Sequence, residues 1–117
     1  MTYVDGFILA VPKANIEAYK EMARTGGVVW KEHGALSYVE CIADDVPYGE
    51  LTSFPRAVLA NEDEVVIFSW ITYASRADRD AINAKVMADP RLSPQNWEMP
   101  FDGKRLIYGG FESFVEV

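Results

Sequence analysis

The fold is decided by the stretch Phe68-Ser69-Trp70-Ile71-Thr72-Tyr73-Ala74-Ser75-Arg76-Ala77-Asp78-Arg79-Asp80. Its first half is apolar and rich in aromatic and β-branched residues, which is typical of a strand. Ser75 followed by Asp78 fits a capping box, which begins a helix. A strand followed by a helix also opens the chain, so two such units predict a small α/β fold.

The first unit is predicted from residues 3–34. Residues 3–11 form an apolar strand that Pro12 ends. Asn15 is expected to cap a helix whose apolar side chains recur at steps of three and four up to Trp30, and Gly34 is expected to end it. Within this helix, Gly26-Gly27 predicts either close packing against the sheet or a bend.

The rest of the chain is predicted to supply three strands and the second helix. The strands are expected at residues 35–43, 65–73 and 105–117. The connection 44–63 is unusually long, and Phe54 and Val58 are expected to hold part of it in place. We also expect a helical turn to start at residues 55–57.

The second helix is expected to present a narrow alanine stripe, with Ile82 and Val86 beside it, and to end at Asp89-Pro90. In the last strand, Gly109-Gly110 predicts a bulge or a close approach of two backbones.

The element order is β-α-β-β-α-β, and the predicted fold class is therefore α+β and ferredoxin-like. One domain, residues 1–117, would hold an antiparallel four-stranded sheet with both helices on one face. The strands are apolar on both faces, however, and two helices cover only one. We therefore expect the other face to meet a second copy of the chain, giving a homodimer of the type called a dimeric α/β barrel.

Composition narrows the possible partners and the location. The 117 residues carry a formal net charge of -7, which disfavours binding to nucleic acid or to anionic membrane surfaces. The single cysteine excludes an internal disulfide. With no secretory signal and no long apolar run, we expect a cytoplasmic protein. No metal-ligand motif and no glycine-rich phosphate loop is present, so neither a metal nor a cofactor is expected.

Several blocks of sequence resemble a bacterial family catalogued as domain of unknown function 1428. They are Tyr3-Val4-Asp5-Gly6-Phe7, Glu40-Cys41 ahead of Asp44-Asp45-Val46-Pro47, Phe68-Ser69-Trp70-Ile71, Asp89-Pro90-Arg91, Met99-Pro100-Phe101-Asp102-Gly103-Lys104-Arg105 and Tyr108-Gly109-Gly110-Phe111. The resemblance covers almost the whole chain. It implies the dimeric α/β-barrel fold and no assigned activity, so no catalytic residue is carried over from it.

Three ionisable residues are the candidates for catalysis. His33 is either a general base or a residue that complements the dipole at the end of its helix. Asp5 and Glu40 lie in predicted strands, where burial would raise the pKa of a carboxylate and allow it to accept a proton. Glu112 also lies in a predicted strand, but it could equally be a solvent-exposed charge on the edge strand of the sheet. Arg105 is expected to neutralise one of these carboxylates or to hold an anionic substrate.

A candidate ligand pocket lies between the helices and the sheet. Its expected lining residues are Trp30, Tyr38, Trp70, Arg105 and Tyr108, with the tyrosine hydroxyls as polar groups on an apolar wall. The aromatic members are also expected to be part of the core. Cys41 is expected to be a small buried apolar residue. The pairs of Arg76 and Arg79 with Asp80 are expected to be solvated.

Three functions remain open at this point. The first is a homodimer that binds a small, mostly apolar molecule without necessarily transforming it. The second is an enzyme, since the architecture resembles that of cofactor-independent monooxygenases, although a fold does not imply a function. The third is a structural or assembly role. An apolar cavity without convergent ionisable groups would favour the first, and a closed interior would favour the third.

Overall fold

The computed structural model describes residues 2–117 and has the predicted α+β architecture. The helices and strands, in chain order, are β1 (Tyr3–Pro12), α1 (Ile16–Glu32), β2 (Ser37–Ile42), α2 (Phe54–Ala57), β3 (Glu64–Tyr73), α3 (Arg76–Met87) and β4 (Ile107–Glu112). Short 3-10 turns occupy Lys13–Asn15, Pro90–Leu92, Pro94–Asn96 and Gly103–Arg105. The order of the long elements is β-α-β-β-α-β, with α2 as one turn inside the connection from β2 to β3.

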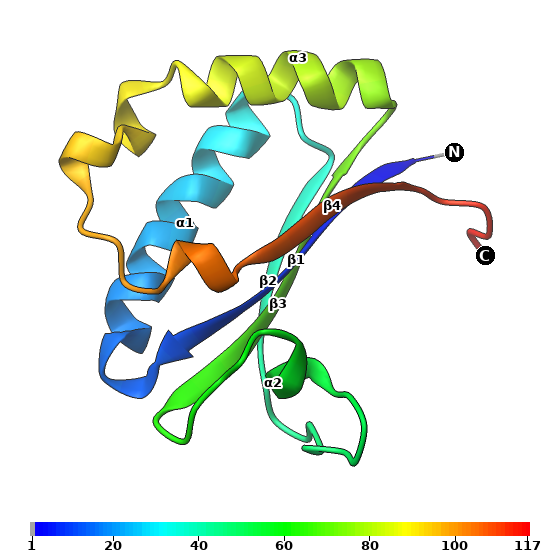
Figure 1. Ribbon diagram of the computed structural model, residues 1–117. Helices are drawn as coiled ribbons and strands as arrows, with labels where there is room; N and C mark the ends of the chain where they lie inside the picture. The colour runs from blue at the N-terminus through cyan, green and yellow to red at the C-terminus, as the bar shows by residue number, and fades with distance from the viewer. Residues whose placement is uncertain (1) are drawn as a thin grey trace.

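The four strands form one antiparallel sheet in the order β2-β3-β1-β4, which confirms the ferredoxin-like prediction. The two longest strands, β1 and β3, pair along their whole length, from Tyr3 opposite Tyr73 to Pro12 opposite Glu64. They lie in the middle of the sheet, which explains why their sequences are nearly continuous apolar runs. Helices α1 and α3 lie on one side of this sheet (Figure 1).

Alternate residues of the central strands form the core beneath the helices. Leu9, Val11 and Ile67 pack with Tyr19 and Ala23 of α1 in one cluster. The second cluster lies nearer to α3 and contains Tyr3, Val29, Ala35, Ile71, Tyr73, Ile82 and Val86. This face of the sheet is therefore covered by the chain itself.

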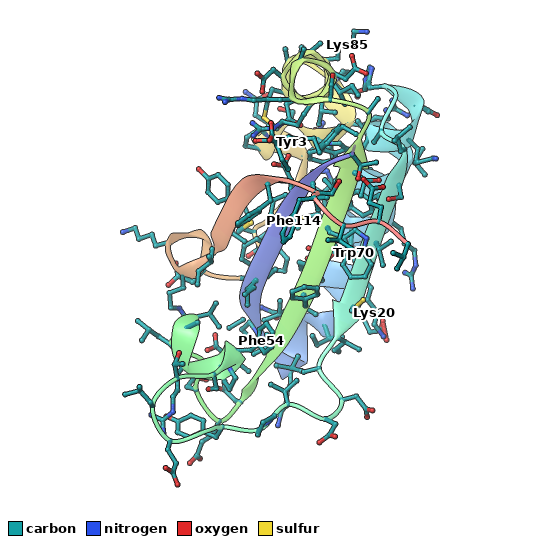
Figure 2. The ribbon with its side chains drawn as sticks, turned by 90° about the vertical axis from the view of Figure 1, so that its right-hand side faces the viewer. Tyr3, Lys20, Phe54, Trp70, Lys85 and Phe114 are labelled. Atoms are coloured by element: carbon teal, nitrogen blue, oxygen red, sulfur yellow. The ribbon has the colours of Figure 1, made fainter. Side chains whose placement is uncertain are left out.

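The opposite face, here called the open face, carries no helix longer than α2 (Figures 1 and 2). Its strand positions hold Val4, Gly6, Ile8 and Ala10 of β1, Ser37, Val39 and Cys41 of β2, Val66, Phe68, Trp70 and Thr72 of β3, and Ile107, Gly109 and Phe111 of β4. None of them is charged, although a quarter of the whole chain is. Phe68 is 42 % exposed and Phe111 is 65 % exposed.

The long connection 44–63 covers one end of the open face. Val58, which is fully buried, packs there against Ala10 and Val66. Phe54 remains 44 % exposed, but its ring meets that of Phe68 edge-on at 5.7 Å. The expected helical turn is α2, capped by the Ser53 hydroxyl, which accepts a hydrogen bond from the Arg56 amide.

Helix α1 begins and ends where the sequence predicts, but its first cap differs. Asn15 stands at the cap position and makes no capping hydrogen bond, because its side-chain amide donates to the Pro100 carbonyl at 3.0 Å instead. At the other end Gly34 has φ +116°, a left-handed value that favours glycine. The predicted close packing at Gly26-Gly27 is confirmed, because Tyr38 of β2 lies directly against both glycines.

Helix α3 contacts the sheet through a different stripe from the predicted one. Ser75 accepts a hydrogen bond from the Asp78 amide, as expected. The alanine stripe is exposed, however, and the buried residues are Ile82 and Val86. The larger side chains remove more apolar area from water than alanine does, so they set the rotation of the helix.

The last strand is shorter than predicted and has no bulge. Strand β4 pairs only with β1, and since β1 begins at Tyr3, pairing ends at Glu112 opposite it. Arg105 lies in a 3-10 turn before the strand rather than within it. The Gly109-Gly110 pair continues the regular register. What lies close to Gly110 is a side chain and not a second backbone, because a Cβ atom there would lie 2.7 Å from Tyr3 Cε2.

Candidate functional site

The candidate site is an apolar cavity of about 260 Å³ between α1, the covered face of the sheet and the segment that leads from α3 to β4. Figure 1 shows this segment passing around α1 before it returns to the sheet. The lining residues are mostly apolar or aromatic and include Phe7, Leu9, Met22, Ala23, Trp30, Ile71, Leu92, Phe101 and Leu106. Such a lining, with few polar groups, is typical of small-molecule sites.

One charged side chain, Glu40 of β2, lies among these lining residues. Its two carboxylate oxygens each accept a hydrogen bond from a tyrosine: Oε1 from Tyr19 at 2.7 Å and Oε2 from Tyr38 at 2.8 Å. Burial and the neighbouring Glu40 charge raise the pKa of both tyrosines well above its usual range, so both hydroxyls remain donors at neutral pH. A carboxylate has about four acceptor positions, so Glu40 keeps acceptor capacity for a ligand.

The position of Tyr38 follows from the two glycines of α1. A Cβ atom at Gly26 would lie 3.0 Å from Tyr38 Oη, and one at Gly27 would lie 3.1 Å from Tyr38 Cδ1. Side chains at either position would displace the tyrosine ring. The glycine pair therefore lets α1 pack closely on β2, which brings Tyr19 of α1 within reach of Glu40.

The segment after α3 is fastened to the end of α1 by a polar cluster. His33 Nε2 lies 2.9 Å from Asp89 Oδ2, and Arg91 contacts both Asp89 at 2.8 Å and Glu32 at 2.7 Å. Hydrogen bonds from Arg91 and His33 lower the pKa of Asp89, so its carboxylate is ionised at neutral pH. The cluster holds the start of the segment that supplies Leu92 to the cavity wall.

A wider groove of about 540 Å³ lies between α1 and the free edge of β2. It shares Tyr19, Ala23, Tyr38 and Glu40 with the cavity. Three basic residues of α1 also line it: Lys20, Arg24 and Lys31. The two hollows therefore meet at the Glu40 carboxylate and its tyrosine donors.

The structure brings together the side chains of two of the five predicted ligand-binding residues. Trp30 and Tyr38 line the cavity, and their rings lie 5.9 Å apart. Trp70 borders the cavity as part of β3, but its strand position is on the open face, where its ring packs on Phe68. Arg105 does not line the cavity: it forms a pair with Glu64, and not with Asp5, Glu40 or Glu112. Tyr108 is 73 % exposed on the edge strand β4, so the prediction that it belongs to the core is wrong. Edge position explains this, because no further strand lies beside β4.

Among the three catalytic candidates, Glu40 alone lines the cavity. His33 lies in the Asp89 cluster at the end of α1. Asp5 is buried in a separate polar cluster under α3, where Arg79 Nε lies 3.5 Å from its Oδ1. Burial raises the pKa of Asp5, against the opposing effect of Arg79, as predicted for a carboxylate inside the sheet.

Two further predictions are corrected by the structure. Cys41 is exposed rather than buried, because it lies on the open face of an edge strand. Arg79 is not a solvated charge: its Nη2 donates to the Tyr3 hydroxyl at 2.9 Å, and its Nε has no hydrogen-bond partner within residues 2–117.

Sequence reasoning missed Tyr19 as a site residue. It lies on the predicted apolar stripe of α1, which marks it for the core, and it is buried there. A buried tyrosine hydroxyl needs a hydrogen-bond partner. A tyrosine on the apolar stripe of a helix, together with a glutamate in the strand that follows, could therefore have indicated this pair.

No helix within residues 2–117 is long and apolar enough to cross a bilayer. In the same range, no three acidic, histidine or cysteine side chains gather where they could hold a metal ion.

The chain is thus an α+β protein of ferredoxin-like topology with an apolar cavity under its first helix, and it belongs to a family of proteins without an assigned activity. Residues 2–103 match the family described as "Protein of unknown function (DUF1428)". The curated relatives include the proteins named "Uncharacterized protein YbaA" of Escherichia coli strain K12, Escherichia coli O157:H7 and Shigella flexneri. Each is 55% identical to this chain over 116 residues, which cover 99% of both chains.

Proposed function

We propose that this chain is a homodimeric binding protein for a small, mostly apolar molecule that carries one hydrogen-bond donor. The proposal rests on one observation: a single carboxylate, Glu40, lies among the lining of an otherwise apolar and aromatic cavity. The apolar wall would take the body of the ligand, and Glu40 would accept a hydrogen bond from its O–H or N–H group.

The size of the cavity limits the ligand. At about 260 Å³ it is slightly smaller than most drug-sized ligand sites. A bicyclic aromatic compound with one N–H group fits this description. Trp30 and Phe101 would offer aromatic surfaces to such a ring.

The tyrosine pair supports recognition of a donor rather than an acceptor. Both hydroxyls already donate to Glu40, one to each oxygen. A ligand with only acceptor groups would have to take a tyrosine donor away from the carboxylate, which costs a charge-assisted hydrogen bond. A ligand with a donor can use the remaining lone pairs of Glu40.

Binding is better supported than catalysis. An enzyme mechanism of the kind considered from the sequence would need His33 beside Glu40 in the cavity. His33, the general base expected from the sequence, lies with Asp89 instead. A structural role without a ligand is the outcome of the experiment below if nothing binds.

The homodimer is proposed from the open face. Its strand positions carry no charge, so they resemble the interior of an interface more than a solvated surface. Two strands of ten residues and two of six give a sheet of on the order of 500 Å² per copy. Two copies would bury about 1,000 Å², the lower limit for a biological interface. A second copy presents the same uncharged face, and two-fold symmetric pairs are the commonest assemblies.

The cavity proposal is tested with indole and N-methylindole, which differ in the one donor group. Calorimetric titration should give tighter binding of indole, by about tenfold, because N-methylindole leaves Glu40 without its added hydrogen bond. In Glu40→Gln the ratio of the two affinities should fall towards one, since the charged acceptor is gone. Glu112→Gln, which removes a strand carboxylate outside the cavity, should keep the preference.

Two results would contradict the cavity proposal. Equal affinity of the two compounds for the unaltered protein would show that Glu40 is not the recognition group. Absence of binding by both would favour an assembly role over ligand binding.

A further inference from the structure

The groove between α1 and the free edge of β2 differs from the cavity in its charge. Lys20, Arg24 and Lys31 line it, and Glu40 is the only carboxylate that does. The whole chain carries a net charge of -7. A local excess of positive charge on a strongly acidic protein favours an anion at this place.

Lys20 and Arg24 are the cations with most freedom to meet a ligand. Lys20 lies 4.0 Å from Glu17, and both side chains are largely exposed, so this pair is weak. Arg24 makes no ion pair with any carboxylate of residues 2–117. Lys31 is engaged differently, because its Nζ donates to the Leu36 carbonyl at 2.9 Å.

Spacing on α1 places the two free cations next to each other in the middle of the groove. Lys20 and Arg24 are four residues apart, about one helical turn. The α1 residues that line the groove run from Ile16 to Lys31, and Lys31 lies about 10 Å further along the helix axis than Arg24. An anionic group bound at Lys20 and Arg24 would therefore have part of the groove on either side of it along the axis.

The part of the groove towards the start of α1 has an apolar wall. Ile16 of α1 packs in one cluster with Ile67, which pairs with Ile42 of β2, and all three residues line the groove. Ile42 is 47 % exposed, and no further strand covers it because β2 is at the edge of the sheet. The groove therefore offers apolar surface on the Ile16 side of the two cations.

We propose that this groove binds a small amphipathic carboxylate of the medium-chain aliphatic type. The carboxylate pairs with Arg24, whose planar guanidinium suits a two-point contact, and with Lys20. The aliphatic chain runs along the groove towards Ile16 and Ile42. Both Glu40 oxygens already accept tyrosine hydrogen bonds, which lowers the repulsion that this carboxylate would exert on the ligand.

This site is separate from the proposed donor-recognising cavity. Lys20, Arg24, Val28 and Lys31 line the groove and not the cavity. A ligand in the groove is recognised by its negative charge, and a ligand in the cavity by its hydrogen-bond donor. Each proposal can therefore fail without the other.

The test is a titration of the full chain with sodium octanoate, followed by backbone amide NMR, with 1-octanol as the uncharged comparison. Octanoate should shift the amide signals of Ile16, Arg24 and Ile42 and bind about fivefold to tenfold more tightly than octanol. Higher salt should weaken octanoate binding and leave octanol binding unchanged.

Two matched variants decide whether the groove is responsible. Arg24→Gln should weaken octanoate binding by about fivefold to tenfold and leave octanol binding unaffected. Arg76→Gln removes the same charge from α3, where the side chain is 72 % exposed, and should change neither. Amide spectra of both variants establish that they are folded.

Three results would overturn the proposal. The first is equal binding of octanoate and octanol, and the second is an equal loss of affinity in both variants, which would indicate a general charge effect. The third is a set of octanoate shifts confined to the open face, which would place the ligand there and not in the groove.

Discussion

The Nε atom of Arg79 on α3 lies 3.5 Å from Oδ1 of Asp5 on β1, and this contact joins the second helix to a central strand. The guanidinium also donates to Tyr3 Oη at 2.9 Å and contacts Asp80 at 3.2 Å. Asp5 is nevertheless so buried that desolvation raises its pKa despite the nearby positive charge. The contact therefore compensates only part of the cost of burying a carboxylate.

This balance predicts a pH dependence with a definite sign. The folded protein holds the Asp5 proton to a higher pH than the unfolded chain, whose pKa is near 3.8. The stability that Asp5 contributes is thus fully present below 3.8 and is lost as pH rises through its raised pKa. Urea unfolding measures this. As pH rises, the free energy of unfolding of the unaltered protein should fall relative to that of Asp5→Asn. A difference that does not change with pH would contradict it.

Gly110 is predicted to be required for the same cluster. A Cβ atom at this position would overlap Tyr3 Oη and Arg79 Nη2, which are hydrogen-bonded to each other. Gly110→Ala should therefore lower the free energy of unfolding by about 1–3 kcal/mol, since a buried ring and a fastened guanidinium must both shift. Gly109→Ala is the matched control, because its Cβ would meet only Phe111 Cε1 at an ordinary 3.6 Å. Equal losses in the two variants would show that the overlap is not the cause.

Much of the fold could be predicted because its signals are local. The capping residue Ser75, the left-handed Gly34 and the Asp89-Pro90 step each act within a few residues of the chain. The continuous apolar pattern of β3 likewise follows from its central place in the sheet. The predicted length of β4 was wrong, because this length depends on where its partner β1 begins.

The candidate site was predicted less completely because it depends on register between distant elements. Tyr19 and Glu40 are 21 residues apart and meet only when α1 packs on β2 at the level set by Gly26-Gly27. Arg79 was misjudged for a simpler reason. It precedes Ile82 by three residues and therefore lies on the buried face of α3, a pattern that its charge concealed.

The pair of Arg105 with Glu64 predicts stability that disappears in acid. Arg105 Nη1 and Nη2 donate to the two Glu64 oxygens at 2.8 and 2.6 Å, and Nη1 also reaches the Leu59 carbonyl. The Arg105 hydrogen bonds lower the pKa of Glu64 below 4.5. Its stabilising contribution is thus present above 4.5 and is lost as pH falls through the lowered pKa.

Glu64→Gln should accordingly melt a few degrees below the unaltered protein at neutral pH and approach it in acid. Calorimetry between neutral pH and acid measures both effects. Glu62→Gln, at an exposed neighbouring position, is the control and should melt like the unaltered protein throughout. A gap between Glu64→Gln and the unaltered protein that persists in acid would show that the ion pair is not its source.

Phe68→Asp is predicted to separate the proposed homodimer without unfolding the chain. Phe68 stands on the open face, 42 % exposed, so a carboxylate there stays solvated in a single copy. Across a two-fold interface the same carboxylate would be buried without a partner, which costs about 2 kcal/mol or more and raises the dissociation constant at least about thirtyfold. Sedimentation velocity over a range of concentrations measures the shift, and near-ultraviolet circular dichroism establishes that the core is intact.

Leu51→Asp is the matched control for this prediction. Leu51 is 92 % exposed within the connection 44–63 and lies outside the strands, so the same added charge should leave the sedimentation profile unchanged. Because both variants carry the same net charge, general repulsion between acidic chains would affect them equally. Only a contact through the open face separates them. A folded Phe68→Asp that sediments like Leu51→Asp would therefore exclude that face as the dimer interface.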